Sequence, residues 1–276
     1  LHTNSSNNTL FADADGNIAY MHSNFIPRRD TAFDWSRPVP GHDPRADWQG
    51  VFSFEESPNV VNPPNGWVYN TNNWPYSAAG PHSPKRSDYP AYVDAGSENA
   101  RGLHAIRVLE NRKDFTISSL DDAAYDEYLT AFEVMLPPLL RDYDALSATD
   151  PLKDRLAGQM ATVRAWDYRW SDHSIPTTLA IYWGDELQRS IAGAATQARM
   201  SCYDYAIQRA TPAERFRALQ VAYDTLTSHF GTWRTPWGHV NRFQRLTGDI
   251  VQQFSDAAPS IPVAFPSARW GSLASF

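Results

Sequence analysis

Prolines and large aromatic residues constrain the first third of this chain most strongly. Between residues 25 and 64 proline recurs at positions 27, 38, 40, 44, 58, 63 and 64. Proline lacks a backbone N–H and clashes with the preceding helical turn, so no regular helix is expected there. Aromatic side chains lie between the prolines, at Trp35, Trp48, Phe52 and Phe54. The stretch is therefore predicted to be an ordered, extended connection that ring packing holds in place.

A polar turn near the beginning of the chain predicts a β-hairpin. Residues 9–12 and 17–21 are short β-prone runs, and Asp13-Ala14-Asp15-Gly16 between them supplies turn chemistry. The same acids superficially resemble the start of a calcium loop. Such a loop needs further oxygen ligands, and none follow at the right spacing. Residues 66–70 are a third strand candidate.

From residue 97 to residue 231 the spacing of apolar residues is helical. Helices are expected from Ser97 to Leu109, after Ser119, from Asp150 to about Trp166, from near Pro176 to near Ala198, and from Thr211 to Gly231. The last is the clearest, because Thr211, Pro212 and Glu214 form a capping box with proline at the first helical position. In the second, Pro137 and Pro138 are expected to break or kink the helix.

These patterns divide the chain into three sections. Residues 1–96 form a β-hairpin and a Pro- and aromatic-rich loop section, residues 97–231 a helical section, and residues 232–276 a loop-rich section that returns to the core. The predicted fold class is α+β, with a short β and loop section followed by a mostly helical one.

The charge balance excludes a general nucleic-acid binder. The chain has 24 Lys and Arg against 31 Asp and Glu, a net charge of -7, whereas binding phosphates needs clustered excess cations.

Cys202 is the single cysteine, so an internal disulfide is excluded. The longest apolar stretch, residues 179–183, is too short to cross a bilayer, so no membrane insertion is expected. Neither a signal peptide nor an initiator methionine is visible, and we expect a processed or trimmed piece of a longer product.

Common catalytic and metal-binding motifs are absent from the sequence. The histidines include no i, i+4 pair and no HExxH, so no metal site is predicted. GxSxG, GxGxxG and GxxxxGK(S/T) do not occur either. Asp172-His173 could orient a general base, but a surface hydrogen bond is the commoner outcome for such a pair. Glu55 and Glu56 suggest a glycosidase pair, yet adjacent residues in an extended segment point to opposite faces.

An asparagine-rich run follows the third strand candidate. Asn70, Asn72 and Asn73 precede the stiff dipeptide Trp74-Pro75. A side-chain amide held rigidly there could donate a hydrogen bond to an oxyanion in acyl transfer. On composition alone, an ordinary asparagine turn is the favoured interpretation. Arg101, in the first turn of the next predicted helix, either braces such a site, neutralises a substrate carboxylate or lies on a solvated face.

Several segments of the first 110 residues follow a family pattern in order and spacing. Residues 12–22 resemble an AD-x-x-GNI-x-Y-x-H hairpin, and residues 37–50 resemble a PVPG…W-x-G stretch. Residues 62–75 resemble NP-x-x-G-x-x-x-N-x-NN-x-P, and residues 97–101 begin an Arg-bearing helix. These segments resemble the signatures of the penicillin acylase family of N-terminal nucleophile hydrolases. Residues 237–272 are similar to its branch of acyl-homoserine-lactone and aculeacin acylases.

The resemblance implies two stacked, mostly antiparallel sheets between helical layers, an αββα sandwich of which this chain is a part. In the family a precursor cuts itself, and the freed N-terminal serine of the large subunit attacks an amide carbonyl with its own α-amine as base. A backbone N–H and the amide of the second Asn in N-x-NN, here Asn72, hold the oxyanion. Arg101 matches the arginine that helps to position this asparagine.

One departure from the family pattern concerns the nucleophile. Leu1 is not serine, threonine or cysteine, and the nucleophile strand and the small subunit have no counterpart in this sequence. The resemblance therefore implies an internal section of the large subunit, inactive alone, whose partners are the remaining segments of the same precursor. Part of the family binds calcium through a ligand near Trp35, but the other ligands fall mainly outside this sequence. No metal or other cofactor is therefore predicted.

The leading hypothesis is an amide hydrolase that deacylates small N-acyl compounds such as acyl-homoserine lactones, penicillins or acylated peptides. Trp67, Tyr69 and Trp74 are the candidate walls of its substrate pocket. The alternative is a non-enzymatic ligand-binding module on an acylase-like scaffold, suggested by the missing nucleophile and the many aromatic residues. Members of the family are commonly exported, so a periplasmic or secreted location is expected.

Overall fold

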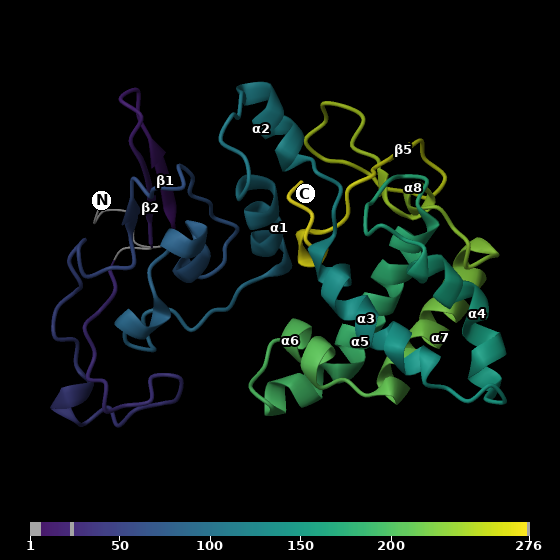
Figure 1. Ribbon diagram of the computed structural model, residues 1–276, viewed down its shortest axis with the longest axis horizontal. Coiled ribbons are helices and arrows are strands. Elements are labelled where there is room, and N and C mark those ends of the chain that lie inside the picture. The colour runs from purple at the N-terminus through teal and green to yellow at the C-terminus, as the bar shows by residue number, and fades with distance from the viewer. Residues whose placement is uncertain (1–6, 23–24, 275–276) are drawn as a thin grey trace. The chain divides into compact units, whose positions relative to one another are not determined.

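The computed structural model describes residues 7–22 and 25–274 of the chain (Figure 1). Leu1, on which the expectation about the nucleophile rests, lies outside these described residues. The chain divides into two compact units, Leu1–Leu120 and Asp121–Phe276. The division into three sections remains a prediction from the sequence.

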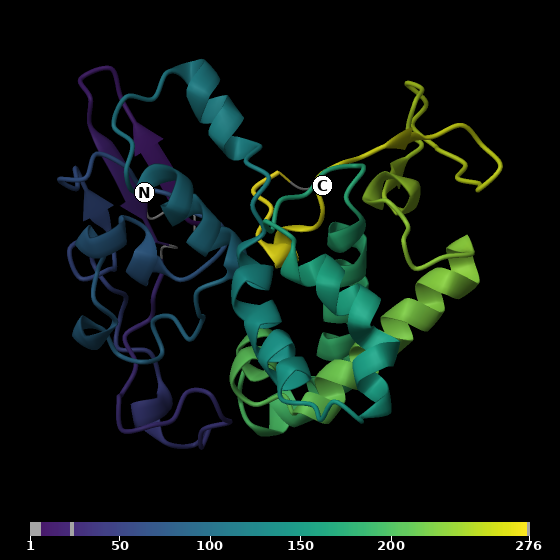
Figure 2. The same ribbon diagram turned by 45° about the vertical axis from the view of Figure 1, so that its right-hand side comes forward.

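The first unit contains a three-stranded antiparallel sheet in the order β1-β2-β3. Its strands are β1 (Thr9–Ala12), β2 (Ile18–Met21) and β3 (Val60–Val61), and β1 and β2 lie side by side in Figures 1 and 2. The predicted hairpin is confirmed. Its turn is closed by the Asp13 carboxylate, which accepts hydrogen bonds from the backbone N–H of Asp15 at 3.0 Å and of Asn17 at 2.8 Å.

The third strand of this sheet is not the one that the sequence predicts. Residues 66–70 form no strand; Tyr20 of β2 pairs instead with Val60. The chain turns at Gly66, whose φ is +79°, and runs on to Tyr69, whose N–H donates to the carbonyl of Ala78 at 2.9 Å. A local run of β-prone residues does not decide which segment finds a strand partner.

Short 3-10 helices replace longer helices in the proline-rich part of this unit. They are η1 (Pro44–Ala46), η2 (Pro75–Ser77), η3 (Gly80–His82) and η4 (Arg86–Asp88). Three of them carry proline in their first two positions, where the missing N–H costs no helical hydrogen bond. The small core of the unit is built from Tyr20, Val60, Ala78 and Ala79, with Val68 packed against it.

Two helices follow the loop section, α1 (Ala100–Leu109) and α2 (Ile117–Ala124). The sequence predicts that the first helix begins with Ser97, a residue type that can cap a helix, but Ser97 does not cap α1. Asn99 caps α1 instead, because its side-chain oxygen accepts the N–H of Gly102 at 2.8 Å. This cap lies two residues later than Ser97 and places Arg101 in the first turn of α1.

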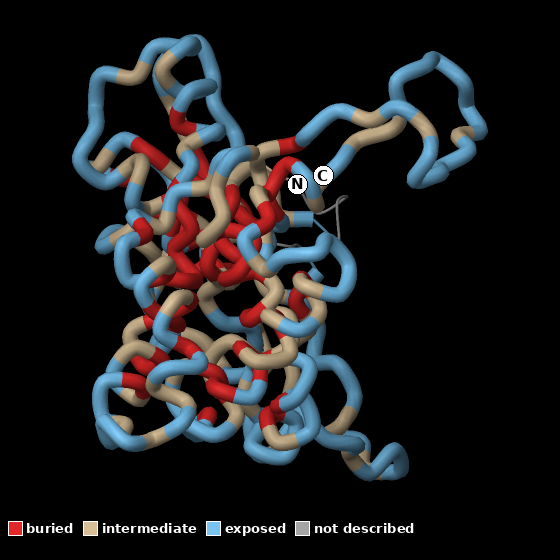
Figure 3. The backbone as a smooth tube through the Cα atoms, turned by 90° about the vertical axis from the view of Figure 1, so that its right-hand side faces the viewer, coloured by how far each residue is buried: buried red, intermediate tan, exposed pale blue. Residues whose placement is uncertain are grey.

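The second unit is mostly helical. Its elements are α3 (Thr130–Asp144), α4 (Pro151–Arg164), α5 (Ile175–Gln197), α6 (Cys202–Gln208), α7 (Pro212–Phe230), α8 (Trp237–Val240), β4 (Arg242–Phe243), β5 (Ile261–Pro262) and η5 (Ala268–Trp270). Helix α5 packs against α4, α6, α7 and α8, and contributes the fully buried Trp183 and Leu187 to the core. Figure 3 shows the buried stretches of the chain in red.

Three of the predicted helices of this unit are confirmed as α4, α5 and α7. Asp150 caps α4 through the N–H of Leu152. At α7, Thr211 and Glu214 form the predicted capping box, and Gly231 ends the helix with a φ of +77°. The sequence did not predict α6 and α8, which have seven and four residues.

Of the break or kink predicted at Pro137 and Pro138, the break does not occur. The chain breaks between α2 and α3, and α3 continues through both Pro137 and Pro138. The break occurs where the Leu129 N–H donates to the carbonyl of Tyr168 at 2.8 Å, outside any helix. Within α3 the side chains of Phe132, Met135, Leu136 and Leu139 are almost completely buried, and this packing offsets the helical hydrogen bonds that proline removes. The α+β class, with its short N-terminal β section followed by helices, is confirmed.

No helix in the described part of the chain is long and apolar enough to cross a membrane.

Candidate functional site

Asn72 lies at the tip of a short loop between two buried neighbours. Thr71 and Asn73 are buried, whereas Asn72 is exposed and has a φ of +58°. Asparagine tolerates this left-handed conformation better than most residues. The turn is held by the side chain of Asn70, which accepts the backbone N–H of Asn72 at 3.0 Å. The backbone therefore presents the Asn72 side chain outward, while both neighbours anchor the loop.

Arg101 fixes which way the amide of Asn72 faces. Its Nη2 donates to Asn72 Oδ1 at 2.7 Å and also to the carbonyl oxygen of Thr71. A guanidinium has no acceptor, so the amide oxygen must face Arg101 and the amide NH2 must face away from it. Among residues 7–22 and 25–274 the structure shows no acceptor for this Nδ2. Partial burial lowers the pKa of Arg101 below its ordinary value, but arginine remains charged.

The N-terminus of α1 holds the loop on the side of Thr71. The Asn99 amide donates to the carbonyl of Thr71 at 3.2 Å, and the Thr71 hydroxyl lies 3.4 Å from Asn99 Oδ1. The same Asn99 oxygen caps the helix through Gly102. Asn99 therefore bonds both to the loop that carries Asn72 and to the helix that carries Arg101. One hydrogen-bond network holds both residues in place.

Asn73 holds the loop on its other side. Its Nδ2 donates to Glu98 Oε1 at 2.8 Å and lies 3.1 Å from both the Tyr69 hydroxyl and Ser77 Oγ. Burial raises the pKa of Tyr69, so its hydroxyl stays protonated, and this hydroxyl lies 2.8 Å from Ser77 Oγ. Sequence reasoning missed Glu98 and Asn99, although both lie in the quoted family segment just before Arg101.

Asn72 also borders a shallow, mostly polar hollow of about 540 Å³. The hollow is lined by Asn7, Asn8, His22, Asn70, Asn72, Asn73, Val93, Asp94 and Ala95. His22 Nδ1 is 3.1 Å from the Tyr20 hydroxyl, and its Nε2 is 3.5 Å from Asp94 Oδ2. Burial lowers the pKa of His22, and the nearby Asp94 opposes this in part. His22 is the last residue of the first family segment, but nothing in the sequence predicted that it lines the same hollow as Asn72.

The three aromatic residues predicted to line a substrate pocket do not line this hollow. Trp67 is buried and its ring lies so close to Gly80 that an added Cβ there would come within 2.9 Å of it. Tyr69 is buried in the network around Asn73. Trp74 is partly buried, and its indole N–H donates to Glu98 Oε2 at 3.3 Å. Their contact with substrate stays a prediction.

Other candidate residues serve ordinary structural roles. Asp172 and His173 lie 3.6 Å apart, and the His173 side chain is 91% exposed, as expected for a surface pair. Arg28 binds Glu56 and, with the Ser53 N–H, lowers the pKa of that carboxyl to about 2. No group of three metal-ligating side chains is found among the residues that the structure describes.

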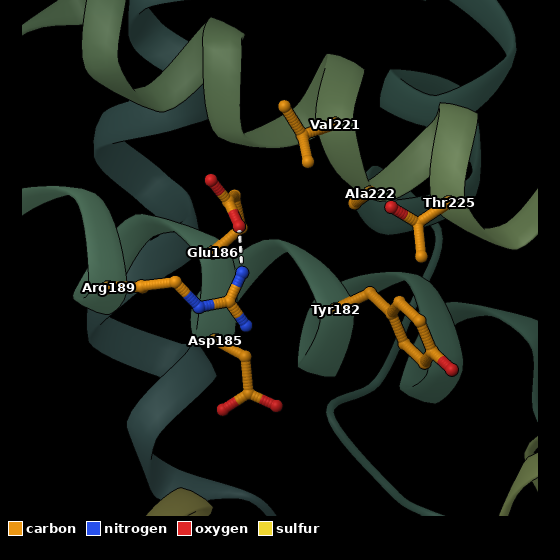
Figure 4. Close-up of a pocket in the computed structure, with 7 residues that line it drawn as sticks. All are labelled: Tyr182, Asp185, Glu186, Arg189, Val221, Ala222 and Thr225. Carbon is orange, nitrogen blue, oxygen red and sulfur yellow. Dashed lines mark hydrogen bonds and ion pairs between the residues drawn. The ribbon is translucent and has the colours of Figure 1, made fainter.

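A second small cavity, of about 130 Å³, lies between α5 and α7 (Figure 4). Its charged side chains are paired: Arg189 binds Glu186 within the cavity, and Arg269 binds Asp185 at 2.9 Å. Burial raises the pKa of Asp185, which Arg269 opposes.

Comparison with known proteins decides the family. The family model of penicillin amidase matches residues 1–264. The chain belongs to the penicillin amidase family. It is 29% identical over 171 residues to penicillin G acylase from Escherichia coli, covering 58% of this chain and 18% of that protein. A solved structure, thermostable penicillin G acylase from Alcaligenes faecalis, matches with a TM-score of 0.56 and 19% identity, covering 81% of this chain and 47% of that one.

These matches confirm the family recognised from the sequence motifs, and the structural match supports the N-terminal nucleophile hydrolase fold. The matched regions span 18% of the curated relative and 47% of the solved chain. The assignment to the acyl-homoserine-lactone and aculeacin branch stays a prediction from residues 237–272.

Proposed function

We propose that this penicillin amidase family chain is part of an enzyme that hydrolyses the amide bond of small N-acyl compounds. In this proposal Asn72 donates a hydrogen bond to the oxyanion that forms on the attacked carbonyl. The observation that carries it is the 2.7 Å bond from Arg101 Nη2 to Asn72 Oδ1. It leaves the amide NH2 of an exposed asparagine facing away from Arg101, where it can serve as a rigid neutral donor.

The chemistry divides between this chain and the rest of the precursor. A serine hydroxyl on another segment attacks the carbonyl carbon, its proton passes to the serine's own α-amine, and the carbonyl π electrons move to the oxygen. Asn72 Nδ2 stabilises that oxygen, and the charge of Arg101 polarises the amide without contacting the substrate. Collapse of the intermediate expels the amine, which takes the proton, and water then releases the acid.

Acyl-homoserine lactones, penicillins and acylated peptides are the proposed substrate classes, with Trp67, Tyr69 and Trp74 as walls of the acyl pocket. The remaining segments of the same self-processing precursor are the proposed partners, and the periplasm or the exterior is the proposed location. Mass measurement and N-terminal sequencing of the mature protein test the processing: a polypeptide that begins with serine is expected.

The test of the oxyanion role uses Asn72→Ala in the complete enzyme, assayed with N-acyl anilides of different acyl lengths. Loss of one oxyanion donor is expected to lower kcat about 10²–10³-fold with little change in KM. Asn111→Ala, at an exposed position after α1, is the matched control and should keep normal kcat. A near-normal kcat for Asn72→Ala would refute the oxyanion role of Asn72. Saturable binding of acyl compounds without any turnover in the wild type would favour the ligand-binding alternative.

A further inference from the structure

Glu98 occupies an unusual place for a carboxylate next to the asparagine loop. It directly precedes Asn99, the cap of α1, and its side chain turns toward the loop that carries Asn72. No Lys, Arg or His forms an ion pair with it among the described residues. What it binds instead is a set of N–H and O–H donors.

Four donors surround the two carboxylate oxygens of Glu98. Oε1 accepts from Asn73 Nδ2 at 2.8 Å and from the backbone N–H of Asn99 at 2.9 Å. Oε2 accepts from the Tyr69 hydroxyl at 3.2 Å and from Trp74 Nε1 at 3.3 Å. An ionised carboxylate is an acceptor at every lone pair, so it satisfies all four donors at once. The start of a helix also favours a negative charge.

A glycine of α1 leaves room for this carboxylate. A Cβ at Gly102 would lie 2.0 Å from Glu98 Oε1 and 3.0 Å from Asn73 Nδ2. Any larger residue at position 102 would therefore push the carboxylate away from Asn73. Glycine is the poorest helix former after proline, so its place inside α1 is explained by this close approach.

Two of the four donors of Glu98, from Asn73 and Trp74, lie on the side of Asn72 that Arg101 does not hold. Arg101 and Asn99 secure the Thr71 side, whereas Glu98 secures Asn73 and Trp74, which follow Asn72 directly. Glu98 does not hydrogen-bond Asn72 itself. Any effect of Glu98 on the oxyanion donor must therefore pass through the position of the loop.

We infer that Glu98 is a positioning residue for the reaction: its carboxylate ties Asn73, Tyr69 and Trp74 to the start of α1 and so sets the place of the Asn72 amide. This inference rests on the proposed function, because it acts through the oxyanion role of Asn72. It adds a required carboxylate to a site whose proposed members are an amide and a guanidinium.

The first test replaces Glu98 by glutamine in the complete enzyme. Glutamine keeps the shape but presents an NH2 to donors that need an acceptor, so the loop should shift. A small misplacement of a catalytic donor is expected to lower kcat about tenfold with KM unchanged. Glu110→Gln, at the exposed C-terminal end of the same helix, is the control and should keep wild-type kcat. Gly102→Ala, which displaces the carboxylate without removing it, should reproduce the kcat loss and covers the case in which Glu98→Gln fails to fold.

A double-mutant comparison separates positioning from a general structural role. If Glu98 acts through Asn72, Glu98→Gln should lower kcat in the wild type but cause no further loss in the Asn72→Ala enzyme. An equal loss in both backgrounds, or no loss in the wild type, overturns the inference while leaving the role of Asn72 intact. A normal kcat for Asn72→Ala alone overturns the proposed function and this inference with it.

Discussion

Replacing Arg101 by methionine measures how much of the rate depends on a held Asn72 amide. The change keeps most of the apolar stem and removes the Nη2 that bonds both Asn72 Oδ1 and the Thr71 carbonyl. A hydrogen bond to a charged group contributes about 1.5–3 kcal/mol. If that contribution is lost in the transition state, kcat falls about 10- to 150-fold. The loss should stay at or below that of Asn72→Ala, because Arg101 acts only by orienting that residue.

The assay is steady-state kinetics of the mature enzyme on an N-acyl anilide, with kcat and KM resolved separately. Arg107→Met, an exposed position further along α1, controls for loss of a positive charge from the helix. A loss of kcat larger than that of Asn72→Ala would refute the orienting role. A rise in KM alone, confined to substrates with a carboxylate, would show instead that Arg101 binds the substrate.

Two further predictions concern stability and are measured by urea unfolding. Arg215 is 6% exposed and bonds Asp142 Oδ2 at 2.7 Å, so Asp142→Ala leaves a buried guanidinium without this partner. The free energy of unfolding should then fall by about 3–5 kcal/mol. A change within experimental error would contradict this prediction. Burial lowers the pKa of His22, so below about pH 6.5 the unfolded state binds more protons, and stability should fall as the pH falls. His22→Gln should weaken this acid dependence, and an unchanged pH profile would argue against it.

Features set by residues a few positions apart were predictable from the sequence. The turn at Asp13, the cap at Asp150 and the capping box of Thr211 and Glu214 each bond groups within four residues of one another. Such bonds form whenever the local backbone adopts the turn, so residue type and spacing are enough to predict them. The roles expected for Asn72 and Arg101 came instead from the resemblance to a family pattern.

Helix boundaries and caps were predicted less well where local residue preference competed with tertiary packing. Two prolines predicted a break or a kink, yet α3, with its buried face, continues unbroken through Pro137 and Pro138. Ser97 and Asn99 are both good caps, and the choice of Asn99 goes with its bonds to Thr71, 28 residues away. Propensity has no information about such a partner.

The sequence by itself determined the family, the α+β order of elements, and the residues proposed for the oxyanion site. The tertiary structure decided how they are held: it placed Arg101 against Asn72 across 29 positions, and filled the space left by Gly102 with the Glu98 carboxylate. The reason is that a hydrogen bond between distant residues exists only when the chain between them folds back to the right distance. That return depends on the packing of the whole unit rather than on any short run of residues.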